Sequence, residues 1–233
     1  MKIAPIFFSI MILCKLNVSA QNDFSTQGQM GNASFGIYGG VNFQNINGKA
    51  ANGSKLSNSL VTKFHLGINE DFPIAPDFYF QAGIQFMGKG TEGNVQYIEN
   101  GVTYTITRNL NLNYLEIPLN LIYKPLLGSG NLILGFGPYI GYAINGRASF
   151  AGNNAPSDAA VKFVGTAPTT DNNNLTYFKR LDVGANFMVG YQFQNRIFLV
   201  LNSQLGLVPI NAQTGTDLIN KNTGFGLSLG YRF

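Results

Sequence analysis

The chain has 233 residues, of which 11% are charged and 13% aromatic. Charge is low, since a soluble domain usually carries about 25% charged residues. No apolar run of about 20 residues follows the N-terminus, which excludes a mature transmembrane helix. Without Lys2 and Lys15, which lie in an apolar N-terminal segment, 13 basic residues stand against 11 acidic ones. That excess is too small to predict nucleic-acid binding.

The N-terminal segment has the pattern of an export signal. Lys2 supplies a positive charge, residues 3–13 are apolar, and residues 18–20 (Val-Ser-Ala) resemble a cleavage site. We therefore predict a signal peptide over residues 1–20, cleaved after Ala20. Export places the mature protein in the periplasm or the outer membrane of a Gram-negative cell.

The only cysteine, Cys14, lies in the same segment. A lipoprotein would be cleaved before Cys14 and lipidated there, but the bulky Leu13 stands where a small residue is expected. With cleavage after Ala20, the mature chain carries no cysteine. It then has neither a disulfide nor thiol chemistry.

A short polar segment, residues 21–32, precedes the domain that we assign to residues 33–233. Within this domain apolar and polar side chains alternate in successive stretches. A period of two indicates β-strands, because neighbouring side chains point to opposite faces. The eight expected strands cover residues 33–43, 61–72, 78–88, 110–124, 131–144, 177–193, 196–207 and 223–233.

The connections between these strands alternate between long and short. Long loops are expected at residues 44–60, 89–109, 143–176 and 208–222, and short turns at 73–77, 125–130 and 194–195. Within the second loop, residues 102–106 (Val-Thr-Tyr-Thr-Ile) are a candidate extension of the strands beyond the membrane. Outer-membrane barrels have an even number of strands, short periplasmic turns and long external loops. The pattern predicts an all-β protein, an eight-stranded antiparallel up-and-down transmembrane β-barrel. Its first strand would pair with its last, and both termini would lie on the periplasmic side.

The last expected strand shows the alternation most clearly. Its apolar face carries Phe225, Leu227, Leu229, Tyr231 and Phe233, and its other face carries Gly224, Gly226, Ser228, Gly230 and Arg232. We interpret Phe233 as the end that the barrel assembly machinery recognises. A soluble lipocalin-like barrel also alternates, with its apolar face inside. The export signal, the terminal aromatic residue and the unequal loops favour the membrane barrel, in contact with outer-membrane lipids.

Three motifs resemble the PorT-like outer-membrane β-barrel proteins of Bacteroidetes. Residues 113–124 read NYLEIPLNLIYK, residues 135–142 read GFGPYIGY, and the chain ends in GYRF; the leader's Ser-Ala-Gln ending is similar too. The resemblance implies an integral outer-membrane barrel, and the founding member of the family is tied to type IX protein secretion. Pro118, inside the first motif, cannot donate to a ladder and predicts a bulge or a gap in pairing.

Charged residues on the polar faces should form a network in the lumen. Glu116 is expected to face inward, because a charge on the lipid face is costly, and to need a cation there. The candidate cations are Arg232, Arg180 and Lys124, with Asp182 as a second acid. A barrel of eight strands is just wide enough for its own side chains. We interpret the network as a plug, with an ion path or gate as the alternative.

The residues offer little support for catalysis or metal binding. His65 is the only histidine; it could act as a general base in a lipid-modifying enzyme, but no serine is tied to it by spacing. Residues 171–174 (Asp-Asn-Asn-Asn) lack the distal Glu of a calcium loop and read as a solvated loop. We expect no cofactor, no metal and no catalytic site.

The sequence therefore predicts a non-enzymatic structural or interaction barrel that displays loops outside the cell. Two alternatives remain open: a narrow pore for ions or small solutes, and an accessory component of type IX-like secretion that works through outer-membrane or secretion-system partners.

Overall fold

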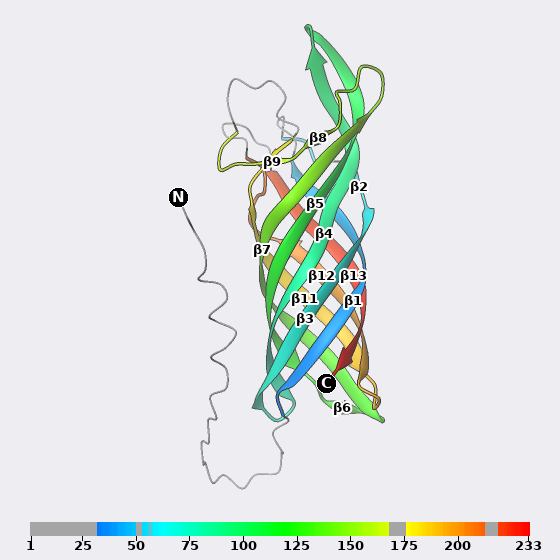
Figure 1. The fold of residues 1–233 in the computed structure, drawn as a ribbon, viewed down its shortest axis with the longest axis vertical. Helices are drawn as coiled ribbons and strands as arrows, with labels where there is room; N and C mark the ends of the chain where they lie inside the picture. Colours follow the sequence, from blue (N-terminus) through cyan, green and yellow to red (C-terminus); the bar gives the residue numbers. More distant parts are fainter. Residues whose placement is uncertain (1–31, 50–52, 56, 168–175, 213–218) are drawn as a thin grey trace.

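The computed structural model describes residues 32–49, 53–55, 57–167, 176–212 and 219–233. Eight long strands form a barrel (Figure 1), and five short strands lie beside it or over one end. The long strands are β1 (Ser34–Lys49), β3 (Val61–Ala75), β4 (Phe78–Glu99), β5 (Val102–Tyr123), β7 (Gly130–Ala151), β11 (Leu181–Gln192), β12 (Ile197–Gly206) and β13 (Ile219–Arg232). The predicted signal peptide, its cleavage site, Cys14 and the Asp171–Asn174 loop lie outside the described residues.

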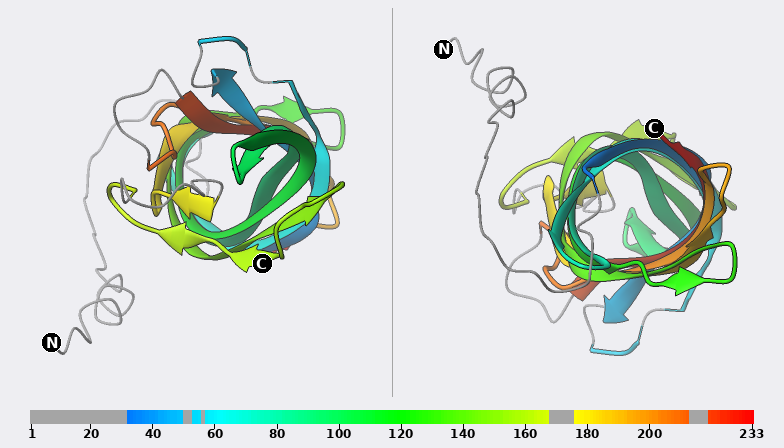
Figure 2. Two further views of the ribbon diagram at one scale, coloured as in Figure 1. Left: turned by 90° about the horizontal axis from the view of Figure 1, so that it is seen from above. Right: turned by 90° about the horizontal axis from the view of Figure 1, so that it is seen from below.

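Each long strand pairs antiparallel with its neighbour in the sequence, and β1 also pairs with β13. The seam between β1 and β13 is long, from Gly36 opposite Arg232 to Lys49 opposite Ile219. Closure leaves no free edge in the wall, as lipid requires. Viewed along its axis, the wall is a complete ring (Figure 2). The prediction of an eight-stranded antiparallel up-and-down barrel is confirmed.

The alternating faces point in the direction of a membrane barrel. On β13, Leu227 and Leu229 are 43% and 60% exposed, whereas Ser228 and Arg232 between and beyond them are 5% and 4% exposed. The same division holds on the other long strands, with exposed Phe, Leu, Ile and Val outside and buried Asn, Gln and charged residues inside. A lipocalin-like barrel would show the reverse. Among the described residues, no helix is long and apolar enough to span a membrane.

The two ends of the barrel differ. At one end, hereafter the turn end, the first residue of β1 lies beside the last residue of β13, and short turns join the strands (Figure 1). At the other end, hereafter the loop end, the hairpin of β4 and β5 rises above the rest (Figure 1). This is the asymmetry that outer-membrane barrels show between their periplasmic and external ends.

The prediction of a loop at residues 89–109 is wrong for most of its length. Almost all of it is strand, and the hairpin turns only at Asn100 and Gly101, which both have positive φ. Residues 89–99 are mostly polar or Gly and show no clear apolar period, although their backbone pairing continues from Lys89 to Glu99. In residues 102–106, Val102, Tyr104 and Ile106 alternate with Thr, as a strand requires.

The expected strand at residues 177–193 begins later than predicted. Tyr177–Phe178 forms a separate short strand, β10, which pairs in parallel with β9 (Lys162–Phe163). The long strand starts only at Leu181. The other short strands are β2 (Asn58–Ser59), β6 (Leu126–Leu127) and β8 (Ala159–Ala160).

Pro118 produces a gap rather than a bulge. Pairing between β4 and β5 runs up to Ala82 opposite Leu119 and resumes at Gln85 opposite Glu116, in the same register. The missing N–H of proline thus interrupts the ladder without shifting it. The register shift in this part of the wall lies at Asn113 and Tyr114, between β5 and β7.

A cluster of buried apolar side chains fills the lumen toward the loop end. We call it the apolar cap; its members are Ile46, Leu110, Leu112, Tyr114, Ala143, Ala148, Val161, Phe178 and Ile210. Each is at most 8% exposed. The segments that carry Val161 and Phe178 lie over the mouth of the barrel (Figure 2). The cap therefore separates the polar lumen from the solvent at the loop end.

Candidate functional site

Three charged side chains meet in the middle of the lumen. Lys89 Nζ lies 2.6 Å from Glu116 Oε1 and 2.9 Å from Asp182 Oδ2. All three side chains have no exposed surface. We call this set the central triad; with one cation and two carboxylates, it carries a formal charge of −1.

Neutral side chains complete the surroundings of the central triad. Gln85 and Gln204 each donate to Glu116 Oε2, at 2.8 and 3.0 Å. Asn222 donates to Asp182 Oδ2 at 2.8 Å. Lys89 Nζ also lies 4.3 Å from the centre of the Tyr139 ring, where a cation–π interaction adds to the ion pairs. Buried charges are tolerated when they are paired and hydrogen-bonded in this way.

Glu116 pairs with Lys89, whereas the sequence predicts Arg232, Arg180 or Lys124 as its cation. Lys89 was expected in a loop, and Arg232 was expected to pair with Glu116. Arg232 lies at the turn end of β13 and contacts Asp71 and Asn69 there, whereas Glu116 contacts Lys89. The sequence does indicate that Lys89 points inward, because Lys89 stands two residues after Met87 on the face that also carries Gln85.

A second ionic group lies nearer the turn end. Asp71 Oδ2 accepts from Lys124 Nζ and lies 3.2 Å from Arg232 Nη2, and Asp71 Oδ1 accepts from Gln81 at 2.8 Å. Arg232 Nη1 donates to Asn69 Oδ1 at 2.6 Å. We call Asp71, Lys124 and Arg232 the turn-end cluster. Its two cations and one carboxylate give a formal charge of +1.

A chain of amides runs across the lumen to the turn-end cluster. Asn186 donates to Asn120 and Asn120 donates to Gln81, both at 3.1 Å, and Gln81 donates to Asp71. These residues come from β11, β5, β4 and β3. Hydrogen bonds thereby link side chains from four of the eight long strands inside the barrel.

Arg180 does not lie in the lumen, contrary to its expected place in the network. Its side chain is exposed, its guanidinium lies over the rings of Tyr142 and Phe163, and it donates to the Ala143 carbonyl at 3.3 Å. The prediction extended the alternation of β11 backward from Asp182. The strand begins at Leu181, so Arg180 precedes it and does not follow its period.

His65 has partners that the sequence did not indicate. His65 Nε2 lies 2.7 Å from Ser228 Oγ, and Nδ1 lies 3.3 Å from Asn42 Oδ1. Asn42 is itself held by donating to the Gly88 carbonyl at 2.7 Å. The contact joins β3 to β13 across 163 residues of sequence, so no local spacing could reveal it.

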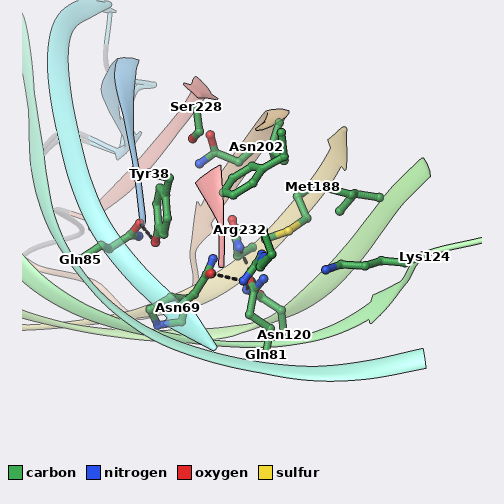
Figure 3. Close-up of a pocket in the computed structure, with 15 residues that line it drawn as sticks. Tyr38, Asn69, Gln81, Gln85, Asn120, Lys124, Met188, Asn202, Ser228 and Arg232 are labelled. Carbon is green, nitrogen blue, oxygen red and sulfur yellow. Dashed lines mark hydrogen bonds between the residues drawn. The ribbon is translucent and has the colours of Figure 1, made fainter. Parts of the chain in front are cut away.

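A small cavity lies against the turn-end cluster, and Tyr38 and Gln85 also line it (Figure 3). Its volume is about 40 Å³, and Tyr38, Gln85, Asn202, Ser228, Lys124 and Arg232 are among its lining residues. At about 10–15 Å³ for each water, it holds a few waters or one small ion and has no room for a lipid chain. The described residues contain no cluster of three or more His, Cys, Asp or Glu side chains that could bind a metal ion.

The terminal Phe233 lies outside the lumen at the seam. It is 62% exposed, its ring centre is 6.0 Å from that of Phe35 and 5.1 Å from that of Tyr231, and its N–H donates to the Phe35 carbonyl at 2.7 Å. It thus extends the pairing of β13 with β1 by one residue. A role in assembly remains a prediction.

Several solved structures are similar to this chain. Ail of Yersinia pestis, solved with the heparin analogue sucrose octasulfate, is 13% identical; the match covers 87% of this chain and 100% of that one, with a TM-score of 0.41. OprG of Pseudomonas aeruginosa is 11% identical over 89% of this chain and 98% of that one, with a TM-score of 0.42.

The N-terminal barrel of OprF from the same organism is 13% identical, covering 88% of this chain and 100% of that one, with a TM-score of 0.37. No curated protein matches the chain. Residues 19–211, most of its length, match the family described as the outer membrane protein beta-barrel domain. A closed barrel with an apolar outer wall and a polar interior is what that family requires in a lipid bilayer. The chain belongs to the outer membrane protein beta-barrel domain family, and it is a protein of the outer membrane.

Proposed function

We propose that this protein is a non-enzymatic, PorT-like barrel that presents a binding surface outside the cell and acts through protein partners. The observation that carries the proposal is the occluded lumen. The central triad has no exposed surface, and the apolar cap covers it toward the loop end. A barrel closed in this way offers its loop end, rather than its interior, to other molecules.

The hairpin of β4 and β5 is the most prominent feature of that end (Figure 1). On one side, β5 pairs with β7 only from Thr107 onward; on the other, β2 pairs with β4 only at Glu92 and Gly93. Among the described residues, residues 95–106 therefore pair only with one another, and no other strand pairs with either outer edge of this part of the hairpin. An unpaired strand edge is a template for an added strand from a partner.

A shortened hairpin tests this proposal. Replacing residues 96–105 by Asn-Gly would close the turn directly after Val95 opposite Ile106, with the dipeptide that two-residue hairpins prefer. We expect the shortened protein to fold and to keep the heat-modifiable gel migration of a barrel. Cross-linking followed by pull-down from outer membranes should lose the partners that the full hairpin captures. An unchanged set of partners would contradict a role for this hairpin.

A narrow pore is the second candidate, supported by the polar lumen and its cavity. The occluded lumen predicts instead that the ionic conductance of the protein in planar bilayers is close to zero. Glu116→Gln should lower stability yet leave conductance near zero, because the amide still fills the site. Arg180→Gln, on the outside of the barrel, serves as the matched control. A large steady conductance in the unmodified protein would favour the pore.

The remaining two alternatives have less structural support. A role as an accessory component of type IX-like secretion is implied by the PorT resemblance alone, and the same pull-down addresses it.

Lipid-modifying catalysis would use His65 and Ser228, whose contact has the form of a base and a nucleophile. The cavity beside Ser228, at about 40 Å³, has no room for an acyl chain, which supports the non-enzymatic proposal.

A further inference from the structure

The turn-end cluster carries more positive charge than its own acid neutralises. Asp71 stands between Lys124 and Arg232, and the three residues are 0%, 7% and 4% exposed. A buried charge without a counter-charge is strongly unfavourable. The negatively charged central triad lies on the other side of Tyr38 and Gln85, and each of its carboxylates already contacts Lys89. The charge of −1 on the central triad therefore balances this excess only from a distance, and Asp71 is the one carboxylate among the described residues that contacts Lys124 and Arg232.

Arg232 has one donor that no described residue uses. Its Nη1 donates to Asn69 and to the Ser34 carbonyl, and its Nη2 contacts Asp71. Its Nε is buried and has no hydrogen-bond partner among the described residues. An unused donor on a buried guanidinium is rare, because leaving it unsatisfied loses the full hydration of that group.

The cavity lies directly against both cations. Lys124 and Arg232 both extend into it (Figure 3), and it has a volume of about 40 Å³. None of the described residues that line it is acidic; apart from the two cations they are amides, hydroxyls and apolar side chains. This volume, several times the roughly 10–15 Å³ that one water needs, accommodates one small ion with a water or two.

We propose that this cavity binds a single small monovalent anion, chloride in the cell. Arg232 Nε and Lys124 Nζ provide its positive contacts, and the bound anion brings the turn-end cluster to neutrality. Waters in the same cavity would satisfy the free oxygens of Asn186 and Asn202, which have no partner among the described residues. The anion thus joins the plug as a structural component on the periplasmic side of the central triad.

Thermal unfolding of the full, folded protein in detergent micelles tests the proposal. Sodium chloride is compared with sodium gluconate at equal ionic strength, because gluconate is too large for the cavity. A ligand that binds only the folded state stabilises it in proportion to ln(1 + [L]/Kd). We expect the melting temperature to rise with the logarithm of the chloride concentration and to stay flat in gluconate. Equal melting temperatures in the two salts would overturn the proposal.

Variants separate this site from a general salt effect. Lys124→Gln removes the excess charge and should abolish the chloride response, as should Arg232→Gln, which also removes the free donor. Arg180→Gln changes a cation on the outside of the barrel and should leave the response unchanged. A response that persists in Lys124→Gln would contradict the assignment.

Diffraction gives a readout that does not depend on how well the variants fold. Crystals of the unmodified protein grown or soaked in sodium bromide should show an anomalous peak in the cavity, within contact distance of Arg232 Nε. A cavity with no anomalous peak at bromide concentrations that raise the melting temperature would overturn the proposal.

Discussion

Replacement of Lys89 by Met should lower the free energy of unfolding by about 3–5 kcal/mol, the usual cost of removing one partner from a buried ion pair. The substitution leaves Glu116 and Asp182 facing each other without a cation, and neither carboxylate has exposed surface. Methionine fills nearly the same volume, so a packing defect contributes little to the loss. Equilibrium urea unfolding in phospholipid vesicles measures the effect.

Two comparisons identify the cause of that loss. Arg180→Met removes a cation from the exposed outer side and should cost at most about 1 kcal/mol, as surface charges and exposed cation–π contacts usually do. Adding Glu116→Gln and Asp182→Asn to Lys89→Met removes the unpaired charges and should restore part of the lost stability. A loss from Lys89→Met no larger than that from Arg180→Met would contradict the central triad.

Leu229→Arg should cost about 2–4 kcal/mol, the penalty for a basic residue near the middle of the bilayer. Leu229 is 60% exposed on β13, midway along an outward apolar face that runs from Phe225 to Phe233. Its exposure to solvent in the isolated chain becomes exposure to hydrocarbon in the membrane. The same urea titration in vesicles of fixed lipid composition measures the change.

Thr223→Arg is the matched control for depth. Thr223 lies on the same outward face of β13, one position closer to the loop end than Phe225, where the run of alternate apolar side chains stops. A basic residue near the interface costs only about 0–1 kcal/mol. Similar losses at positions 223 and 229 would mean that depth in the membrane does not set the penalty. Such a result would place the apolar belt elsewhere on the wall.

The prediction of the barrel succeeded where both faces of a strand were chemically distinct. From Phe225 to Phe233 every second residue is apolar, so the period of two is visible without any knowledge of neighbours. On β5 between Val102 and Asn113 the period of two continues, but there the buried side chains, such as Ile106, Leu110 and Leu112, are apolar and the side chains that alternate with them are mostly Thr and Asn. On β4 beyond Lys89 no clear period remains. The strands there are held by backbone pairing and by contacts such as Asn113 with Asn145 at 2.6 Å, which depend on register.

The lumen residues could be predicted, but their partners could not. Glu116, Asp182, Lys124 and Arg232 are all buried inside the barrel, as their alternation indicates. Which acid meets which base depends on how far each residue stands along the barrel axis. That height depends on the tilt of the strands and on the register of eight pairings, and neither is written in local spacing. Arg180 shows the converse failure: the strand starts at Leu181 instead of residue 177, so Arg180 precedes it and does not follow its alternation.

The sequence by itself determined the class of this protein, the number of its long strands and the inward or outward direction of most of their side chains, because these follow from a local period of two. Only the tertiary structure decided that Lys89 neutralises Glu116 and Asp182, that His65 meets Ser228, and that Arg232 faces a cavity with a free donor. The physical reason is that closing the ring brings together residues from strands that are far apart in the chain. Their contacts depend on the shear and the diameter of the whole barrel.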